Sequence, residues 1–94
     1  MRIAWTDAAL RDLAAARAFI TLDQPLAAAR QIELVVVAAG RLAQFPNSGR
    51  PGRRAGMREL VVGCAPYVLP YRVRGDVVEI LRVLHGRQRW PGEG

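Results

Sequence analysis

The chain has 94 residues, a length that suits one domain over residues 1–94 and leaves no room for two. Hydrophobic residues make up 51% and charged residues 23%, which indicates a folded globular protein and not a disordered one. The 14 cationic side chains exceed the 8 carboxylates, and the formal net charge of +6 predicts a polyanionic or acidic partner: RNA, DNA or an acidic protein segment.

All of the cationic side chains are arginines. Guanidinium groups favour planar, bidentate contacts with phosphate or carboxylate. A GC-rich coding sequence also explains the absence of lysine, although it does not explain the excess of positive charge.

The single cysteine, Cys64, cannot form an internal disulfide, which fits a reducing cytosol. It has no partner at metal-ligand spacing, and no glycine-rich loop precedes a helix. Asp7 and Arg11 interrupt any signal-like apolar run, and no run is long enough to span a membrane. We therefore expect a cytoplasmic protein with no metal, no cofactor and no membrane partner.

The first segment, residues 2–5, is short and apolar and predicts a strand. Thr6 or Asp7 then supplies the N-cap of a helix over residues 8–22. After a break at Asp23-Gln24-Pro25, a second helix is predicted over residues 26–42.

Both helices carry apolar side chains at helical spacing, which predicts one core-facing stripe on each. In the first helix the predicted positions are Leu10, Leu13, Phe19, Ile20 and Ala9 or Ala16. In the second they are Ala28, Ile32, Val35, Val36, Ala39 and Leu42.

The second half of the chain favours strands. Residues 43–56 are rich in proline, glycine and arginine and predict a cationic loop, and three strand-like runs follow at residues 57–62, 67–73 and 77–84. The last two runs are separated by Gly75-Asp76, which predicts a hairpin.

Pro70 lies inside the second run and lacks an N–H for the ladder, so we expect a bulge or an unpaired edge there. The tail, residues 86–94, is expected to lie over the surface. The predicted order is β-α-α-β-β-β, an α+β fold in which a helical hairpin packs on one face of a small, mostly antiparallel four-stranded sheet.

Several short motifs occur in a fixed order along this frame. They are Ile3-x-Trp5-x-x-x-Ala9-x-x-Asp12-Leu13, Leu42-x-x-x-Pro46-x-x-Gly49-Arg50-x-Gly52, Gly56-x-Arg58-Glu59-Leu60-Val61-Val62, Pro66-Tyr67-Val68-Leu69-x-Tyr71-Arg72-Val73, and Ile80-Leu81-Arg82-Val83-Leu84-His85-Gly86-Arg87-Gln88-x-Trp90-Pro91. In this order they resemble the RelE/ParE superfamily of type II toxins, and more closely its ParE side. The resemblance covers essentially the whole chain.

The resemblance implies a toxin that a ParD-like antitoxin neutralises by laying a segment over its groove. ParE-like members poison DNA gyrase by binding it, whereas RelE-like members cut messenger RNA on the ribosome, and the fold does not decide between the two. We favour a gyrase-binding toxin without chemistry of its own. A third alternative is a non-toxic member that only forms a complex with its antitoxin and contacts operator DNA through it.

The enzyme alternative would use Arg58, Arg82, His85 and Arg87. RNA cleavage needs a base and an acid besides cations, and arginine stays protonated, so His85 would carry one role, with Tyr67 or Tyr71 as a weak second. The resemblance to RelE-like nucleases also implies a tyrosine near the C-terminus, which this chain lacks after Tyr71.

For target or antitoxin binding the candidate residues are Arg50, Arg53, Arg54, Arg58, Arg82, Arg87, Arg89 and Trp90. Each also has an ordinary structural interpretation. Alternation places Arg58 and Glu59 on opposite faces of their strand, and Arg58 could simply order the loop before it. Arg82 could be half-buried with Glu59 as its partner, and Trp90 could fold back on the core.

Overall fold

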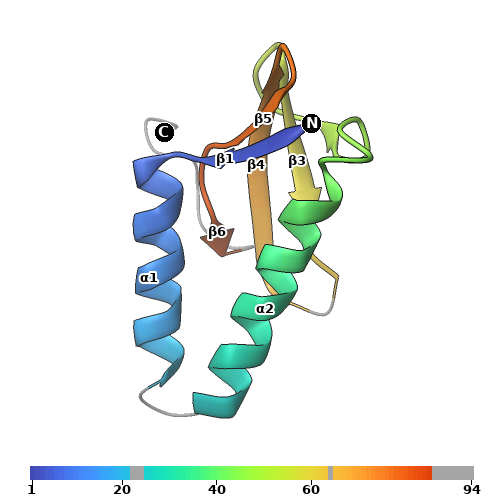
Figure 1. Ribbon diagram of the computed structural model, residues 1–94. Coiled ribbons are helices and arrows are strands. Elements are labelled where there is room, and N and C mark those ends of the chain that lie inside the picture. The colour runs from blue at the N-terminus through green and yellow to red at the C-terminus, as the bar shows by residue number, and fades with distance from the viewer. Residues whose placement is uncertain (22–24, 64, 86–94) are drawn as a thin grey trace.

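The computed structural model describes residues 1–21, 25–63 and 65–85 (Figure 1). Within the helices, the side chains of the predicted core residues Phe19, Ile20 and Ala28 lie outside that description. The elements are β1 (Arg2–Trp5), α1 (Asp7–Thr21), α2 (Pro25–Arg41), β2 (Arg50–Pro51), β3 (Met57–Val61), β4 (Tyr67–Arg74), β5 (Val77–Ile80) and β6 (Leu84–His85).

The strands form one sheet in the order β1-β5-β4-β3-β2, and β6 pairs with β4. β1 runs parallel to β5, and all other pairs are antiparallel. The predicted α+β order and the mostly antiparallel sheet are confirmed. The two-residue strands β2 and β6 are additional to the four predicted strands, because the expected loop over residues 43–56 contains β2 and the expected strand over residues 77–84 divides into β5 and β6.

Both helices pack against one face of this sheet. Alternate residues of β4 and β5 point to that face, where they join Ala9 of α1 and Val35 of α2 in one buried cluster. The strand members include Tyr67, Leu69, Tyr71, Val78 and Ile80. Within the described residues, neither helix is long and apolar enough to cross a membrane.

In each helix, one residue that was predicted to face the core is exposed, and the residue before it is buried. In α1, Ala9 is buried with Leu13 packed beside it, whereas Leu10 is 50% exposed. In α2, Val35 is buried and Val36 is 46% exposed. The predictions for Leu10 and Val36 are therefore wrong, because a helix turns about 100° per residue and the adjacent position leaves the core face.

Thr6, and not Asp7, caps α1. Its Oγ1 accepts a hydrogen bond from the backbone N–H of Ala9 (3.1 Å) and donates one to the carbonyl of Leu81 (2.9 Å). The backbone N–H of Thr6 also donates to the carbonyl of Ile80 (3.1 Å). The same residue thus begins the helix and binds the chain just after β5.

Pro70 lies in the interior of β4, which has β3 on one side and β5 on the other, so the expected edge position is wrong. The expected bulge is confirmed, because residues 69 and 70 lie opposite the three residues 81–83 between the pairs Tyr71–Ile80 and Val68–Leu84. Its carbonyl accepts from the N–H of Leu81 (2.9 Å), which shows that the backbone of Pro70 faces the β5 side. The regular pairing with β5 ends at Ile80. The sheet tolerates a proline here because its missing donor falls where the neighbouring strand stops.

Candidate functional site

Arg58 and Tyr71 hold the loop that precedes β2. They lie opposite each other on β3 and β4. Nη1 of Arg58 donates to the carbonyls of Gly49 (2.8 Å) and Asn47 (3.3 Å). The buried Tyr71 hydroxyl donates to the carbonyl of Pro46 (2.7 Å) and accepts from the N–H of Gly49 (2.9 Å). One interpretation of Arg58 is confirmed by these contacts, namely that it orders the loop.

Gly49 permits this arrangement. A Cβ at this position would lie 2.6 Å from both Cε1 and the hydroxyl oxygen of Tyr71 and 2.9 Å from the carbonyl of Glu59. At Gly52 a Cβ would lie 2.7 Å from the carbonyl of Met57, which accepts the Gly52 N–H at the same distance. Both motif glycines are therefore required for close approach of the backbone to its neighbours.

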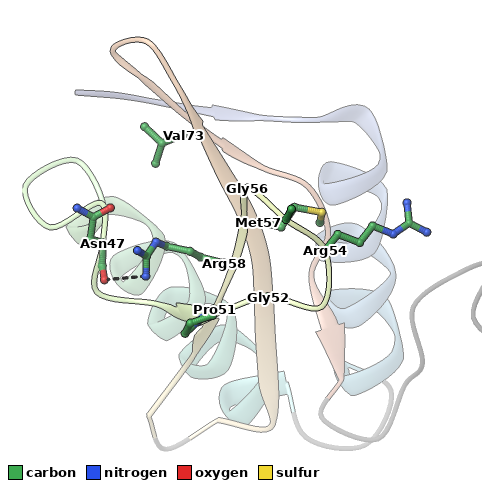
Figure 2. A pocket seen from close by; sticks show the side chains of 9 residues that line it. Asn47, Pro51, Gly52, Arg54, Gly56, Met57, Arg58 and Val73 are labelled. Carbon is green, nitrogen blue, oxygen red and sulfur yellow. Dashed lines mark hydrogen bonds between the residues drawn. The ribbon is translucent and has the colours of Figure 1, made fainter.

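A groove of about 350 Å³ lies beside this loop (Figure 2). Its lining consists of Asn47, Pro51, Gly52, Arg54, Ala55, Gly56, Met57, Arg58 and Val73. Among the residues that the structure describes, the lining contains two arginines and no carboxylate. The groove is therefore electropositive, with apolar walls.

Glu59 lies on the face of β3 opposite to Arg58, as alternation predicts. It is buried, and its carboxylate is 3.1 Å from Nη2 of Arg50 and 3.9 Å from Nε of Arg53. The structure thus draws two of the loop arginines together around one acid, while Arg54 lines the groove instead. Because Arg50 and Arg53 remain more than half exposed, a partner can still reach them.

Arg82 pairs with Asp12 of α1, and the expectation of Glu59 as its partner is wrong. Nε and Nη2 of Arg82 contact the two oxygens of Asp12 at 2.6 and 2.9 Å, and Asp12 also accepts the backbone N–H of Val83 (2.9 Å). The hydrogen bond to Asp12 raises the pKa of Arg82 above its usual value. Residues 81–83 belong to no strand, so the predicted strand-face position of Arg82 is also wrong.

His85 is exposed, and its ring meets that of Tyr67 edge-on, with 6.0 Å between centroids. Burial raises the pKa of Tyr67, which opposes a role as a base. His85 pairs with Tyr67 on β4, whereas Arg58 pairs with Tyr71, four positions along the same strand and about 13 Å away. The structure does not bring the described nuclease candidates, Arg58, Arg82 and His85, to one point.

Several predicted positions lie outside the described residues. These are Arg87, Arg89 and Trp90, the rest of the tail at residues 86–94, and Cys64. Among the residues that are described, no group of three or more histidine, cysteine or acidic side chains could hold a metal ion.

Sequence reasoning gave no separate role to Asp12, although the first motif contained it. The signal that could have identified it is an acid on the helix face that also carries Ala9 and Leu13, because an ionised group there needs a cationic partner. The roles of Gly49 and Tyr71 had no local signal, since their contact joins positions 22 residues apart.

Comparison with known proteins places this geometry in a family. The family model described as "ParE toxin of type II toxin-antitoxin system, parDE" matches residues 3–90. The chain belongs to the ParE toxin family. In the solved structure "Chromosomal ParDE TA system from P. aeruginosa", a chain superposes with a TM-score of 0.82 at 28% identity, covering 90% of this toxin and 95% of that chain.

Three curated relatives cover nearly the whole ParE-family chain. The protein named "Putative toxin Y4kP" from Sinorhizobium fredii is 50% identical over 96% of this chain and 93% of its own. "Toxin RelE2" from Caulobacter vibrioides is 43% identical over 89% of this chain and 93% of its own. "Toxin RelE3" from the same organism is 42% identical over 86% and 89%.

Proposed function

We propose that this ParE-family chain stops bacterial growth by binding DNA gyrase in the cytoplasm, without chemistry of its own. The observation that carries the proposal is the bidentate pair of Arg82 with Asp12, because it removes a cation that the nuclease alternative needs. The loop contacts of Arg58 and the position of His85 support the same conclusion. Family membership supports the toxin role itself.

The second proposed partner is a ParD-like antitoxin. The similarity to a chain of the ParDE system of P. aeruginosa supports such a partner. The exposed arginines Arg50, Arg53 and Arg54 can contact carboxylates of an antitoxin, and operator DNA would be reached only through the antitoxin.

Ribosome-dependent cleavage of messenger RNA is the rival function, and the names of the two Caulobacter relatives favour it. The names of relatives, however, do not show where the side chains of this chain lie. Cleavage would require the ribosome to gather Arg58, Arg82 and His85, and Arg82 would first have to leave Asp12.

The deciding experiment uses purified protein in two parallel reactions. One contains gyrase and supercoiled plasmid, and the other contains ribosomes and a programmed messenger RNA. We expect linear plasmid after denaturation of trapped gyrase, intact messenger RNA, and the same result for His85→Ala. Cleaved messenger RNA with normal supercoiling would replace this proposal with the nuclease. Absence of growth arrest on expression of the toxin alone would leave only the non-toxic complex-forming role.

A further inference from the structure

Arg58 has hydrogen-bonding capacity that the loop does not use. Its guanidinium has five N–H donors. Nη1 makes both contacts with the loop, to Gly49 and Asn47. Among the described residues, Nε and Nη2 have no partner, although the residue is half-buried and lines the groove. An N–H pair of this kind fits the two oxygens of a carboxylate.

The groove around Arg58 accommodates one anionic group on an apolar stem. Val73, which is 38% exposed, and Pro51, which lies opposite Arg58 on β2, supply apolar walls. Figure 2 shows the Arg58 guanidinium near Asn47, with Arg54 pointing away from it. A single inward-facing cation suits a single carboxylate, whereas a nucleic-acid backbone is bound by several cations along a track.

The chain's own nearby acids are already engaged. Glu59 points to the other face of the sheet, where it binds Arg50. Glu79 is 2.9 Å from Arg72, and Asp12 holds Arg82. Since these three described acids are bound to other arginines, the groove is open to a carboxylate of another molecule.

We propose that the groove beside Arg58 binds a glutamate side chain of the antitoxin, with its methylenes against Val73 and Pro51 and its carboxylate on Nε and Nη2 of Arg58. This inference rests on the proposed antitoxin and names the chemistry by which it is recognised. It makes Arg58 both the support of the loop and the anion-binding group of the interface.

The test is calorimetric titration of the full-length toxin with the antitoxin encoded beside it. Val73→Glu adds a carboxylate at the groove and disturbs none of the loop hydrogen bonds. We expect it to weaken binding about tenfold or more, because it competes for Arg58 and repels the incoming acid. Val73→Gln, of the same size without charge, should weaken binding less than about threefold. Val61→Glu, at an exposed position on the opposite face, should leave it unchanged.

A double-mutant cycle identifies the proposed contact. Arg58→Gln is paired with single Glu→Gln changes in the antitoxin, and thermal unfolding checks that the toxin variant is folded. One antitoxin change should cost about tenfold with wild-type toxin and almost nothing further with Arg58→Gln. Equal binding by wild type and Val73→Glu, or no antitoxin acid coupled to Arg58, would overturn the proposal.

These outcomes are separable from failure of the proposed function. If the antitoxin binds wild type and Val73→Glu with equal affinity, only the groove assignment is wrong. If it does not bind wild type at all, the antitoxin proposal and the groove both fail. Poisoning of gyrase is measured without antitoxin and is unaffected by either result.

Discussion

Asp12 and Arg82 are joined by two hydrogen bonds although they lie 70 residues apart in the sequence. The same carboxylate accepts the backbone N–H of Val83, so one side chain of α1 fixes the segment between β5 and β6. This contact converts a cation in a RelE/ParE-like motif from a candidate for chemistry into part of the framework.

Asp12→Asn should therefore destabilise the fold. Both side chains are less than a quarter exposed, and the change leaves the Arg82 guanidinium without its counter-charge. We expect the free energy of unfolding to fall by about 2 kcal/mol in urea denaturation. Glu33→Gln on the exposed face of α2 is the matched control and should stay within about 0.5 kcal/mol. A loss for Asp12→Asn no larger than the control's would contradict this account.

Gly49→Ala should cost about 2 kcal/mol, because the added methyl meets Tyr71 at 2.6 Å and the loop must move. Gly40→Ala is the matched control. It lies within α2 with nothing within 4 Å of a Cβ, so it should stabilise the protein by about 0.5–1 kcal/mol. Thermal melts of both variants check the prediction, and melting of Gly49→Ala at the wild-type temperature would refute the close approach.

Thr6→Val should remove both the cap of α1 and the hydrogen bond to Leu81. The expected loss is about 1–2 kcal/mol in the free energy of unfolding. Thr6→Ser retains the hydroxyl and should lose less than about 0.5 kcal/mol in the same denaturation series. A valine variant as stable as wild type would show that the two hydrogen bonds of the Thr6 hydroxyl do not contribute to stability.

We expect the stability of the fold to depend on the ionisation of Tyr67 at alkaline pH. Burial raises its folded-state pKa above the ordinary value of 10.0, so the folded protein holds the phenolic proton more tightly than the unfolded chain does. This contribution to stability is complete below pH 10 and is lost as pH rises through the folded value. Tyr67→Phe should thus lose less stability than wild type between pH 9 and pH 11 in urea denaturation. Parallel curves for the two proteins would disprove the contribution of Tyr67.

Local pattern determined much of this protein. Periodicity predicted the helices to within about one residue at the ends that the structure describes, and the two-residue Gly75-Asp76 turn fixed the β4–β5 hairpin. These features depend only on residues that are close in the sequence. The geometry of a helix or strand returns side chains to the same face at a fixed spacing, so the spacing can be read from the sequence. The ordered motifs likewise sufficed to identify the toxin family, which the family model over residues 3–90 confirms.

Only the tertiary structure decided which partners the charged and special residues take. The partner of Arg82, the placement of Pro70 in a central strand, and the exposure of Leu10 and Val36 all depend on how distant segments meet. A local pattern predicts that a segment is a helix, but it does not fix which of two adjacent residues faces the core. It also shows that a residue is charged, but not which oppositely charged residue it pairs with. Those choices are made by packing and by pairing across up to 75 residues of chain, as between Thr6 and Leu81.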